Sequence, residues 1–444
     1  MTEKTGLEDV LPLSPLQEGM LFHALFDEQV LDVYTVQLVV DLEGPLHAAR
    51  LRIAAQALLD RHTCLRTAFV LDDDPQLQVV IRGVQAPWVE VDLSAHSAGD
   101  RARELDRLVE HDRIARFDLQ TPPLLRFLLV KIDEAHHRLV MSNHHILLDG
   151  WSMPLVLGDL FALYASNGDG AALPPVRPYR AHLAWLATRD RTAASAAWTH
   201  ALNGIEEPTL LAPADRARPP VLPDQVDADI SADLTARLDS LARAHGLTMN
   251  TLVQGAWAIV LSRSIGRSDV VFGTTVSGRP PELPGVESMV GLFINTVPVR
   301  VRLDPGESLV DLLSRIQVEQ SRLIDHQYVG LAELQRDVGV GDLFDTLTVF
   351  ESYPLDIAAM TRALDGTGVT VTRIEPHDST HYPISLVTVP GARLEIALKY
   401  RPDLFDSLTV RVLVGRLVRV LEVVCGDPGV RVGEVDVLSA RERD

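Results

Sequence analysis

The chain has 444 residues, which is more than one compact core usually holds, so two domains are expected. Hydrophobic residues make up 46% and charged residues 23%, as in ordinary soluble globular proteins, and no apolar run reaches the roughly 18 residues that a membrane-spanning helix needs. The net charge of −20 argues against nucleic acid and anionic membranes as partners, because their phosphate groups would be repelled.

The N-terminal residues MTEKTGLEDV contain no apolar core of a signal peptide, so nothing in them directs export. The two cysteines, Cys64 and Cys425, show neither metal-binding nor redox spacing. Together these features predict a reduced protein of the cytoplasm.

The first part of the chain predicts strands and helices in mixed order. Ser14 can cap a helix, Pro15 suits its first position and Gln17 completes a capping box. Runs rich in β-branched and apolar residues then predict strands at 34–42, 64–71, 77–83, 124–132 and 137–145. Apolar residues at helical spacing and helix-start residues predict helices at 45–62, 101–116 and 152–164.

A Gly- and Pro-rich break at 166–178 has the composition of a linker between lobes. Beyond it the patterns predict helices near 179–203, 231–245, 249–265, 307–326 and 405–425, and strands at 269–277, 291–303, 346–351, 369–374, 384–389 and 393–400. Both parts mix helices and strands. The predicted fold class is therefore α/β, of the α+β kind, with two lobes of similar build.

The segment MSNHHILLDGWSM at 141–153 places two ionisable rings, a carboxylate and a glycine in an apolar run. His144 and His145 end a strand and should point to opposite faces, so that one can face a cavity while the other packs. Asp149 follows four residues after His145, Gly150 allows close approach of the backbone, and the next helix brings its positive dipole end close. This combination offers a neutral base and a place for negative charge.

Two other interpretations stay open on these residues alone. A metal site at His144, His145 and Asp149 is one, although neighbouring strand residues point apart and would not converge on an ion. A buried, hydrogen-bonded structural histidine is the other. A second pair, His136–His137, stands in a polar turn and shows that adjacent histidines alone signify little.

The segment NHHILLDGWS resembles the HHxxxDG signature of condensation domains from nonribosomal peptide synthetases, a family related to chloramphenicol acetyltransferase. Further matches follow the order of the family's motifs: PLSPLQEGMLFH (12–23), RHTCLRTAF (61–69), a poorer match from Tyr179, VGLFINTVPVR (290–300) and DHQYVGLAEL (325–334). The last residues, VDVLSARERD, are similar to the linker that precedes an adenylation domain. The resemblance covers the chain from residue 8 to its end.

The resemblance implies two chloramphenicol-acetyltransferase-like lobes, arranged as a V-shaped pseudo-dimer around a central tunnel. On this basis we expect an N-terminal lobe at 1–170 that carries the HHxxxDG motif and an inter-lobe linker at 171–178. A C-terminal lobe at 179–436 and a linker toward an adenylation domain at 437–444 would complete the chain.

The activity that the resemblance implies is that of an amide-bond-forming acyltransferase. An upstream and a downstream peptidyl carrier protein would deliver thioesters on 4′-phosphopantetheine arms, with no cofactor and no metal bound by the domain itself. The acceptor's amine would attack the donor's thioester. His145 matches the family's second histidine and would either position or deprotonate this amine, and the sequence leaves both roles open.

The same resemblance assigns the neighbouring residues. His144, Asp149 and Gly150 complete the expected catalytic motif, and the family implies that this aspartate pairs with an arginine and holds the loop. Arg279, in TTVSGRPPELP, is the expected partner, because it follows a strand that should end near the site.

Trp151 and Ser152 are candidate substrate-binding residues, although packing is the more ordinary role of such a tryptophan. The remaining polar residues of the motifs are expected to support the structure rather than the chemistry: Arg61, His62, Arg66, Asn295, His326 and Gln327.

The segments SPLQEGMLFHAL and HHILLDGWSMPL are most similar to domains that take a D-configured donor and an L-acceptor. An adjacent adenylation domain is an expected partner, and as a domain excised from a larger synthetase the chain is expected to be monomeric. Two alternatives remain: a catalytically silent binding module that recruits partner enzymes, whose histidine motif is typically damaged, and a free-standing acyltransferase.

Overall fold

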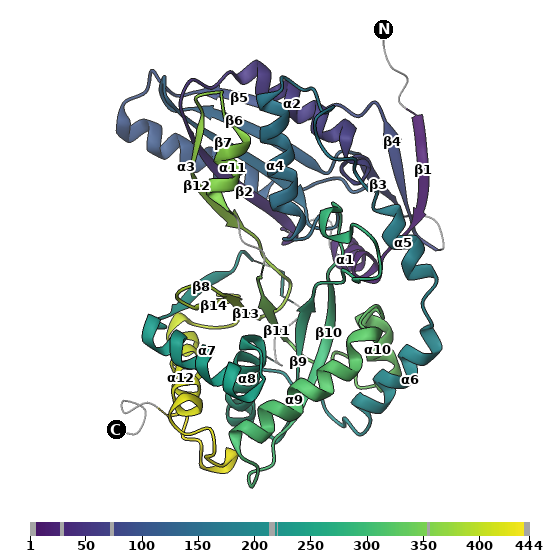
Figure 1. Cartoon of the computed structure of the whole chain (residues 1–444), viewed down its shortest axis with the longest axis vertical. Helices are drawn as coiled ribbons and strands as arrows, with labels where there is room; N and C mark the ends of the chain where they lie inside the picture. The colour runs from purple at the N-terminus through teal and green to yellow at the C-terminus, as the bar shows by residue number, and fades with distance from the viewer. Residues whose placement is uncertain are drawn as a thin grey trace. The chain divides into compact units, whose positions relative to one another are not determined.

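The chain forms two compact units, shown in a computed structural model (Figure 1) that describes residues 6–26, 31–71, 75–212, 218–219, 221–352 and 356–438. The first unit consists of Met1–Arg189, Arg279–Ile294 and Tyr353–Ser379. The second unit consists of Asp190–Gly278, Asn295–Ser352 and Thr380–Asp444. Residues 179–189 and two later segments, all of which follow the predicted linker, therefore belong to the first unit. A single division of the chain near residue 170 does not provide for this.

The prediction of a mixed α and β fold is confirmed in both units. The arrangement of two lobes around a tunnel stays a prediction. Residues 439–444 of the predicted terminal linker lie outside the described residues. Within the described part of the chain, no helix is both long enough and apolar enough to cross a bilayer.

The first unit is built on a five-stranded sheet and a three-stranded sheet. The larger sheet has the order β12 (Thr370–His377), β2 (Thr35–Glu43), β7 (His136–His144), β6 (Leu125–Lys131) and β5 (Trp88–Asp92). The smaller sheet has the order β1 (Gly6–Pro12), β4 (Leu77–Arg82) and β3 (Thr67–Val70). The helices of this unit are α1 (Pro15–Phe26), α2 (Ala48–Arg61), α3 (Ala98–Ile114), α4 (Ser152–Ala165), α5 (Arg180–Ala187) and α11 (Ile357–Ala363).

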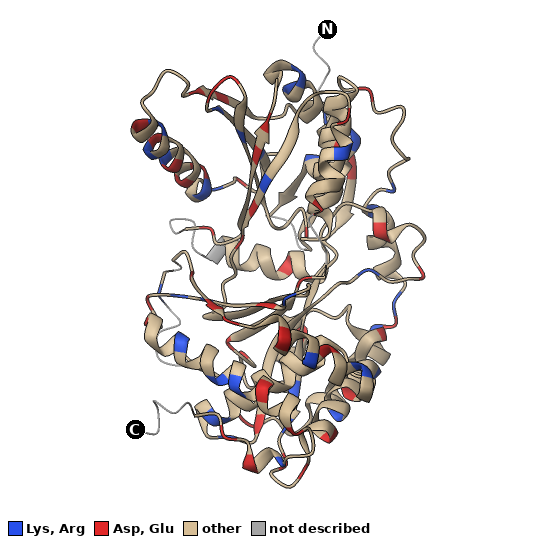
Figure 2. Cartoon of the chain, turned by 60° about the vertical axis from the view of Figure 1, so that its left-hand side comes forward, with Lys and Arg blue, Asp and Glu red and all other residues tan. Residues whose placement is uncertain are grey.

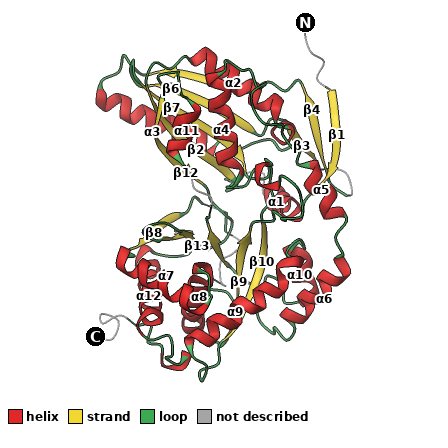
Figure 3. Ribbon diagram, viewed as in Figure 1, coloured by secondary structure: helices red, strands yellow, loops and turns green. Residues whose placement is uncertain are grey.

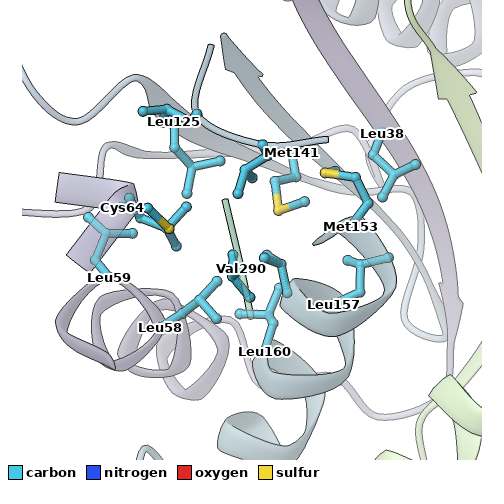
Figure 4. Packing of buried hydrophobic residues seen from close by; sticks show 14 of the residues in the cluster. Leu38, Leu58, Leu59, Cys64, Leu125, Met141, Met153, Leu157, Leu160 and Val290 are labelled. Atoms are coloured by element: carbon cyan, nitrogen blue, oxygen red, sulfur yellow. The ribbon is translucent and has the colours of Figure 1, made fainter. Parts of the chain in front are cut away.

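Alternation along the strands gives the larger sheet two apolar faces. Met141 and Leu139 of β7 belong to the main core with residues of α2 and α4, whereas Val140 faces the opposite side with Leu105 of α3. Figure 4 shows the main core from close by, with Val290 of the segment 279–294 among the leucines of α2 and α4. This packing explains why that segment belongs to the first unit.

Helix α3 covers the second face of this sheet with little apolar surface. Leu105 is its one buried residue, and Figure 2 shows charges of both signs along the rest of the helix. Arg103 pairs with Asp100 and Arg107 with Glu104, each three positions apart. The exposed side of α3 is therefore a solvated, charge-paired surface.

The second unit is built on a six-stranded sheet whose helices are seen in Figure 3. Its order is β10 (Asn295–Arg302), β9 (Asp269–Val276), β11 (Thr346–Phe350), β13 (Ile384–Val389), β14 (Glu395–Tyr400) and β8 (Asp224–Ala228). Its helices are α6 (Arg191–Leu202), α7 (Ala232–His245), α8 (Met249–Ile265), α9 (Leu309–Leu323), α10 (Leu331–Val338) and α12 (Ser407–Gly426). Helix α8 is buried on all sides from Thr251 to Leu261, because α7, α9, α12 and β9 all contact it.

Two elements differ from the sequence-based prediction for identifiable reasons. The helix predicted at 179–203 is two helices, because Asp190 caps a new helix by accepting a hydrogen bond from the Ala193 amide. The strand predicted at 291–303 begins only at Asn295, because the backbone of residues 291–293 binds side chains of the HHxxxDG segment instead of a neighbouring strand. The strands β1, β5 and β8 and the helices α10 and α11 had no sequence-based prediction.

Candidate active site

The HHxxxDG segment forms a strand, a tight turn and a helix start. Strand β7 ends at His144, which lies opposite Thr35 of β2 in the sheet. The His145 amide then donates to the Tyr34 carbonyl at 2.8 Å, and the amides of Leu147 and Leu148 donate back to the two histidine carbonyls. Helix α4 begins at Ser152. The turn therefore holds His145 just beyond the C-terminal end of the central strand β7, on short, fixed backbone.

His144 is fully buried and points into the first unit. Its Nδ1 accepts a hydrogen bond from the Ile146 amide at 3.1 Å, so this nitrogen carries no proton. Its Nε2 lies 3.2 Å from Oδ2 of Asp32, in the loop before β2. A neutral ring with its proton on Nε2 satisfies both contacts. His144 is thus a packed, oriented ring rather than an exposed one.

His145 differs from His144 in being partly exposed. Its Nδ1 is buried, and none of the described residues offers this atom a hydrogen-bond partner. Burial lowers the pKa of the imidazole, and its own carbonyl and the carboxylates of Asp378 and Asp149 oppose this only in part. The ring is therefore neutral at neutral pH, which is the state in which it can accept a proton or a hydrogen bond.

Asp149 is a buried carboxylate that accepts hydrogen bonds on both oxygens. Its Oδ1 accepts from the amide and the hydroxyl of Ser152, at 2.9 and 2.8 Å, and its Oδ2 accepts from the Phe293 amide at 3.0 Å. Nη2 of Arg279 lies 3.1 Å from Oδ1. Asp149 therefore ties the turn to the segment 279–294, and none of these four contacts involves His145.

Arg279 is the arginine that the sequence predicts opposite Asp149. Its Nη1 also donates to the carbonyls of Val286 and Met289, at 2.6 and 2.9 Å, and its guanidinium lies 3.9 Å from the ring centroid of Phe293. Burial lowers the pKa of Arg279, although the carboxylate of Asp149 opposes this. The guanidinium thus organises a whole loop around one carboxylate.

The Ser152 hydroxyl is completely used within the protein. It accepts from the Gly291 amide at 3.1 Å and from Nη2 of Arg279 at 3.0 Å, and it can donate to Asp149 or to the Gly291 carbonyl. A hydroxyl has one proton and two acceptor positions, so none is left for a substrate. The prediction that Ser152 binds substrate is therefore not supported, and the contacts favour a supporting role.

The positions around Ser152 complete this support. Nε1 of Trp151 donates to the Glu287 carbonyl at 3.0 Å, and its ring lies 5.7 Å from the guanidinium of Arg279, which indicates packing. The Gly150 carbonyl accepts from the Met153 amide at the start of α4. Gly291 must be glycine, because a Cβ atom there would lie 2.3 Å from the ring of Tyr179.

A side chain from the first motif reaches the same turn. Gln17 and Ser14 form the predicted capping box, with the Ser14 amide donating to Gln17 at 2.9 Å and the Gln17 amide to the Ser14 hydroxyl at 3.3 Å. Nε2 of Gln17 also donates to the Ile146 carbonyl at 3.1 Å. The motif therefore braces the residue that follows His145, a role that its helix-capping pattern alone does not reveal.

Other predicted support residues lie away from this turn. Nε of Arg61 and Nε2 of His62 both contact Asp159 of α4, at 2.7 and 2.8 Å. Arg66 pairs with Glu8 at 2.6 Å. In the second unit, Nδ2 of Asn295 donates to the Gln327 carbonyl at 2.7 Å. These contacts hold elements together.

His326 offers its carbonyl to Nε1 of Trp198 at 2.8 Å in the second unit. Among the described residues no group of three or more His, Cys, Asp or Glu side chains is arranged to hold a metal ion. Two site residues had no sequence-based prediction: Asp32, beside His144, and Tyr34, whose carbonyl binds the His145 amide. Neither stands in a recognisable motif, so no local signal marks them.

The geometry therefore presents one neutral, partly exposed imidazole on a turn that several buried groups hold in place. Such a group can accept a proton from a nucleophile or orient it by a hydrogen bond. The buried Asp149 and Arg279 neutralise each other and are occupied with backbone and hydroxyl partners.

Comparison with known proteins identifies a family whose members match nearly the whole chain. The family model described as Condensation domain matches residues 7–444. The chain is 36% identical to one subunit of the linear gramicidin synthase of Brevibacillus parabrevis over 448 residues, which covers 99% of this chain and 9% of that relative. The chain thus spans less than a tenth of this relative.

Solved structures share the fold. The X-domain from teicoplanin biosynthesis superposes with a TM-score of 0.82 at 24% identity, covering 99% of this chain and 100% of the X-domain. The first condensation domain of the calcium-dependent antibiotic synthetase, in complex with a substrate analogue, has a TM-score of 0.78 at 22% identity, covering 97% of this chain and 100% of that domain.

Proposed function

Because this chain belongs to the condensation-domain family of nonribosomal peptide synthetases, we propose that it is an acyltransferase that joins two carrier-bound substrates through an amide bond. The observation that carries the proposal is the environment of His145: a neutral, partly exposed imidazole on a braced turn, directly after a second, buried histidine. The intact HHxxxDG segment around it supports the same conclusion.

The reaction needs few chemical groups from the protein. The acceptor's amine nitrogen attacks the carbonyl carbon of the donor thioester, a C–N bond forms, the C–S bond breaks, and the thiol of the donor arm leaves. The amine loses one proton in the process. An α-amine has a pKa of about 7.7–8.0, so a useful fraction is already neutral at neutral pH.

His145 acts on this amine in one of two ways. Accepting its proton is worth about 10²- to 10⁴-fold in rate. Orienting the amine toward the thioester is worth up to roughly 7–11 kcal/mol of the barrier. We assign His145 chiefly to orientation with some base character, through Nε2, because Nδ1 is the buried ring nitrogen.

The substrates would arrive on 4′-phosphopantetheine arms of an upstream and a downstream peptidyl carrier protein, with no cofactor resident in the domain. An adenylation domain would be the neighbour that loads the acceptor. The segments SPLQEGMLFHAL and HHILLDGWSMPL support a D-configured donor and an L-acceptor. A monomeric, cytoplasmic domain within a larger synthetase is consistent with this assembly.

A binding module is the second candidate, since the fold alone is shared with the teicoplanin X-domain, which has been solved in a complex with OxyB. Intact histidines and a buried, fully paired Asp149 favour catalysis over this alternative. A free-standing acyltransferase would release its product instead of leaving it on a carrier, which makes the three functions distinguishable in one assay.

The test supplies carriers loaded with a donor and an acceptor and detects products by mass spectrometry. We expect a dipeptidyl thioester on the downstream carrier, and we expect His145→Ala to lower its formation by about 10² or more without weakening carrier binding. His136→Ala, at the exposed start of the same strand, is the matched control and should keep full activity. Carrier binding without any transfer, or normal turnover by His145→Ala, would refute the proposal.

A further inference from the structure

Asp32 faces the buried ring of His144 from a neighbouring part of the first unit. Its Oδ2 lies 3.2 Å from Nε2 of His144, and the side chains of the two residues are 3% and 0% exposed. The contact lies outside hydrogen-bond geometry, and neither atom has a hydrogen-bond partner among the described residues. A carboxylate that is withdrawn from water and aimed at one ring nitrogen indicates a specific pairing.

The other carboxylate oxygen of Asp32 is connected to the backbone of His145 through two hydrogen bonds of Tyr34. Its Oδ1 accepts from the Tyr34 amide at 3.0 Å, and the Tyr34 carbonyl accepts from the His145 amide at 2.8 Å. On the side of Oδ2, the ring of His144 lies between Asp32 and the turn, and its Nδ1 accepts from the Ile146 amide at 3.1 Å. Asp32 thus connects to the backbone of His145 and of the residue after it.

We propose that Asp32 is a positioning residue, which sets the tautomer of His144 and thereby fixes the turn that presents His145. The inference rests on the proposed amide-forming function for its consequence in catalysis. Its structural part, the tautomer of His144, stands on the contacts of Asp32 alone.

The position of one proton decides two contacts of His144. With the proton on Nε2, this N–H faces the Asp32 carboxylate, and Nδ1 accepts from the Ile146 amide. With the proton on Nδ1, two N–H groups would face each other at Ile146, and a lone pair would face the carboxylate. Both contacts would become repulsive, and the turn after His145 would lose a hydrogen bond.

The charge of Asp32 agrees with this role. Burial raises the pKa of the carboxyl, but the contact with His144, the Tyr34 amide and the charge of Arg116 outweigh it, so the pKa is lowered overall. Asp32 is therefore an ionised acceptor, which favours a donor on the facing ring nitrogen.

The first arm of the test measures the tautomer directly. In protein with ¹⁵N-labelled histidine, the His144 signals, assigned by their loss in His144→Asn, should show a protonated Nε2 and an unprotonated Nδ1. Asp32→Asn should shift these signals toward a mixture, because one oxygen of an amide can serve Tyr34 or His144 but not both. An Nδ1-protonated His144 in the unchanged protein, or identical signals in Asp32→Asn, would overturn the inference.

The second arm measures turnover with loaded carriers. Asp32→Asn should lower kcat by about 10- to 100-fold with little change in KM for the acceptor carrier, because a displacement of about 1 Å at the reacting group can cost about 10²-fold. A purely structural Asp32 would instead lower the midpoint of thermal unfolding and leave kcat of the remaining folded protein unchanged.

Asp133→Asn is the matched control. Asp133 pairs with the exposed His136 at 2.8 Å, at the start of the strand that ends in His144. This variant should alter the His136 signals and leave kcat within twofold of the unchanged protein. If the unchanged protein forms no product while the His144 signals behave as expected, the proposed function fails and the pairing of Asp32 with His144 stands.

Discussion

Asp149 and Arg279 are 130 positions apart in the sequence, yet their carboxylate and guanidinium lie 3.1 Å from each other inside the first unit. Their side chains are 0% and 6% exposed. The pair joins the turn that carries His145 to a segment that returns after a long excursion of the chain through the second unit. The site is thus assembled from distant segments rather than contained in its motif.

Removing Asp149 should cost more than removing both partners. Asp149→Ala leaves the Arg279 guanidinium buried without its carboxylate, which typically costs about 3–5 kcal/mol of unfolding free energy. The double variant with Arg279→Met should recover part of this loss. Urea unfolding of the two single variants and the double variant checks the coupling, and additive losses would contradict it.

Ser152→Ala should reduce both stability and turnover. The change removes a hydroxyl that serves Asp149, Gly291 and Arg279, and a buried polar group left without its partner costs about 1–3 kcal/mol. Chemical unfolding and carrier assays measure the two effects. Ser166→Ala, at the exposed C-terminal end of the same helix, should change neither by a comparable amount.

Acid should destabilise the protein in part through His182. This ring is buried between Phe293 and Trp185, and burial, followed by the charge of Arg279, lowers its pKa to about 3, against about 6.5 in the unfolded chain. The unfolded state therefore binds more protons, so the contribution is complete above pH 6.5 and is lost as the pH falls toward 3.

His182→Phe should accordingly flatten the dependence of unfolding free energy on pH between about 6.5 and 3, by up to about 1.4 kcal/mol per pH unit. Urea titrations at several pH values measure the slope. An equal slope in the variant would show that another group accounts for the loss. His136→Phe, at an exposed position, serves as the comparison.

The rate should show two separate losses of activity as the pH falls. The acceptor amine, with a pKa of about 7.7–8.0, should give log kcat/KM a slope of about one below that pH. Because burial lowers the pKa of His145, the slope of log kcat/KM against pH should increase from about one to about two only below about pH 6.5. Kinetics in His145→Gln should lack this second loss; a second loss that starts at pH 7 or above would contradict a neutral His145 ring.

Local patterns were sufficient where the interactions are local. The capping box of Ser14 and Gln17, the helix that follows it and the strand that ends in the histidine pair all depend on residues within a few positions of one another. The family resemblance, confirmed by the family model over residues 7–444, added the expected pairing of Asp149 with an arginine, for which the structure places Arg279.

Long-range contacts account for what the sequence did not reveal. Residues 291–293 have the apolar composition of a strand, but their amides and carbonyls bind Ser152 and Asp149, which no local window contains. Asp32 has no motif around it, and its partner His144 belongs to a strand far along the chain. The sequence around Ser152 is equally compatible with a hydroxyl that faces a substrate, because its partners Gly291 and Arg279 lie in a distant segment.

The return of residues 279–294 and 353–379 to the first unit has a consequence for biosynthesis. As the nascent chain leaves the ribosome, the turn with His145 emerges well before Arg279 and Gly291, and strand β2 has no β12 beside it until residue 377 is made. At about 5–20 residues per second, the interval from residue 189 to 294 lasts roughly 5–20 s. During that time the nascent first unit exposes an unclamped turn, and the edge of β2 stays unpaired for longer still, which makes the growing chain prone to aggregation during translation.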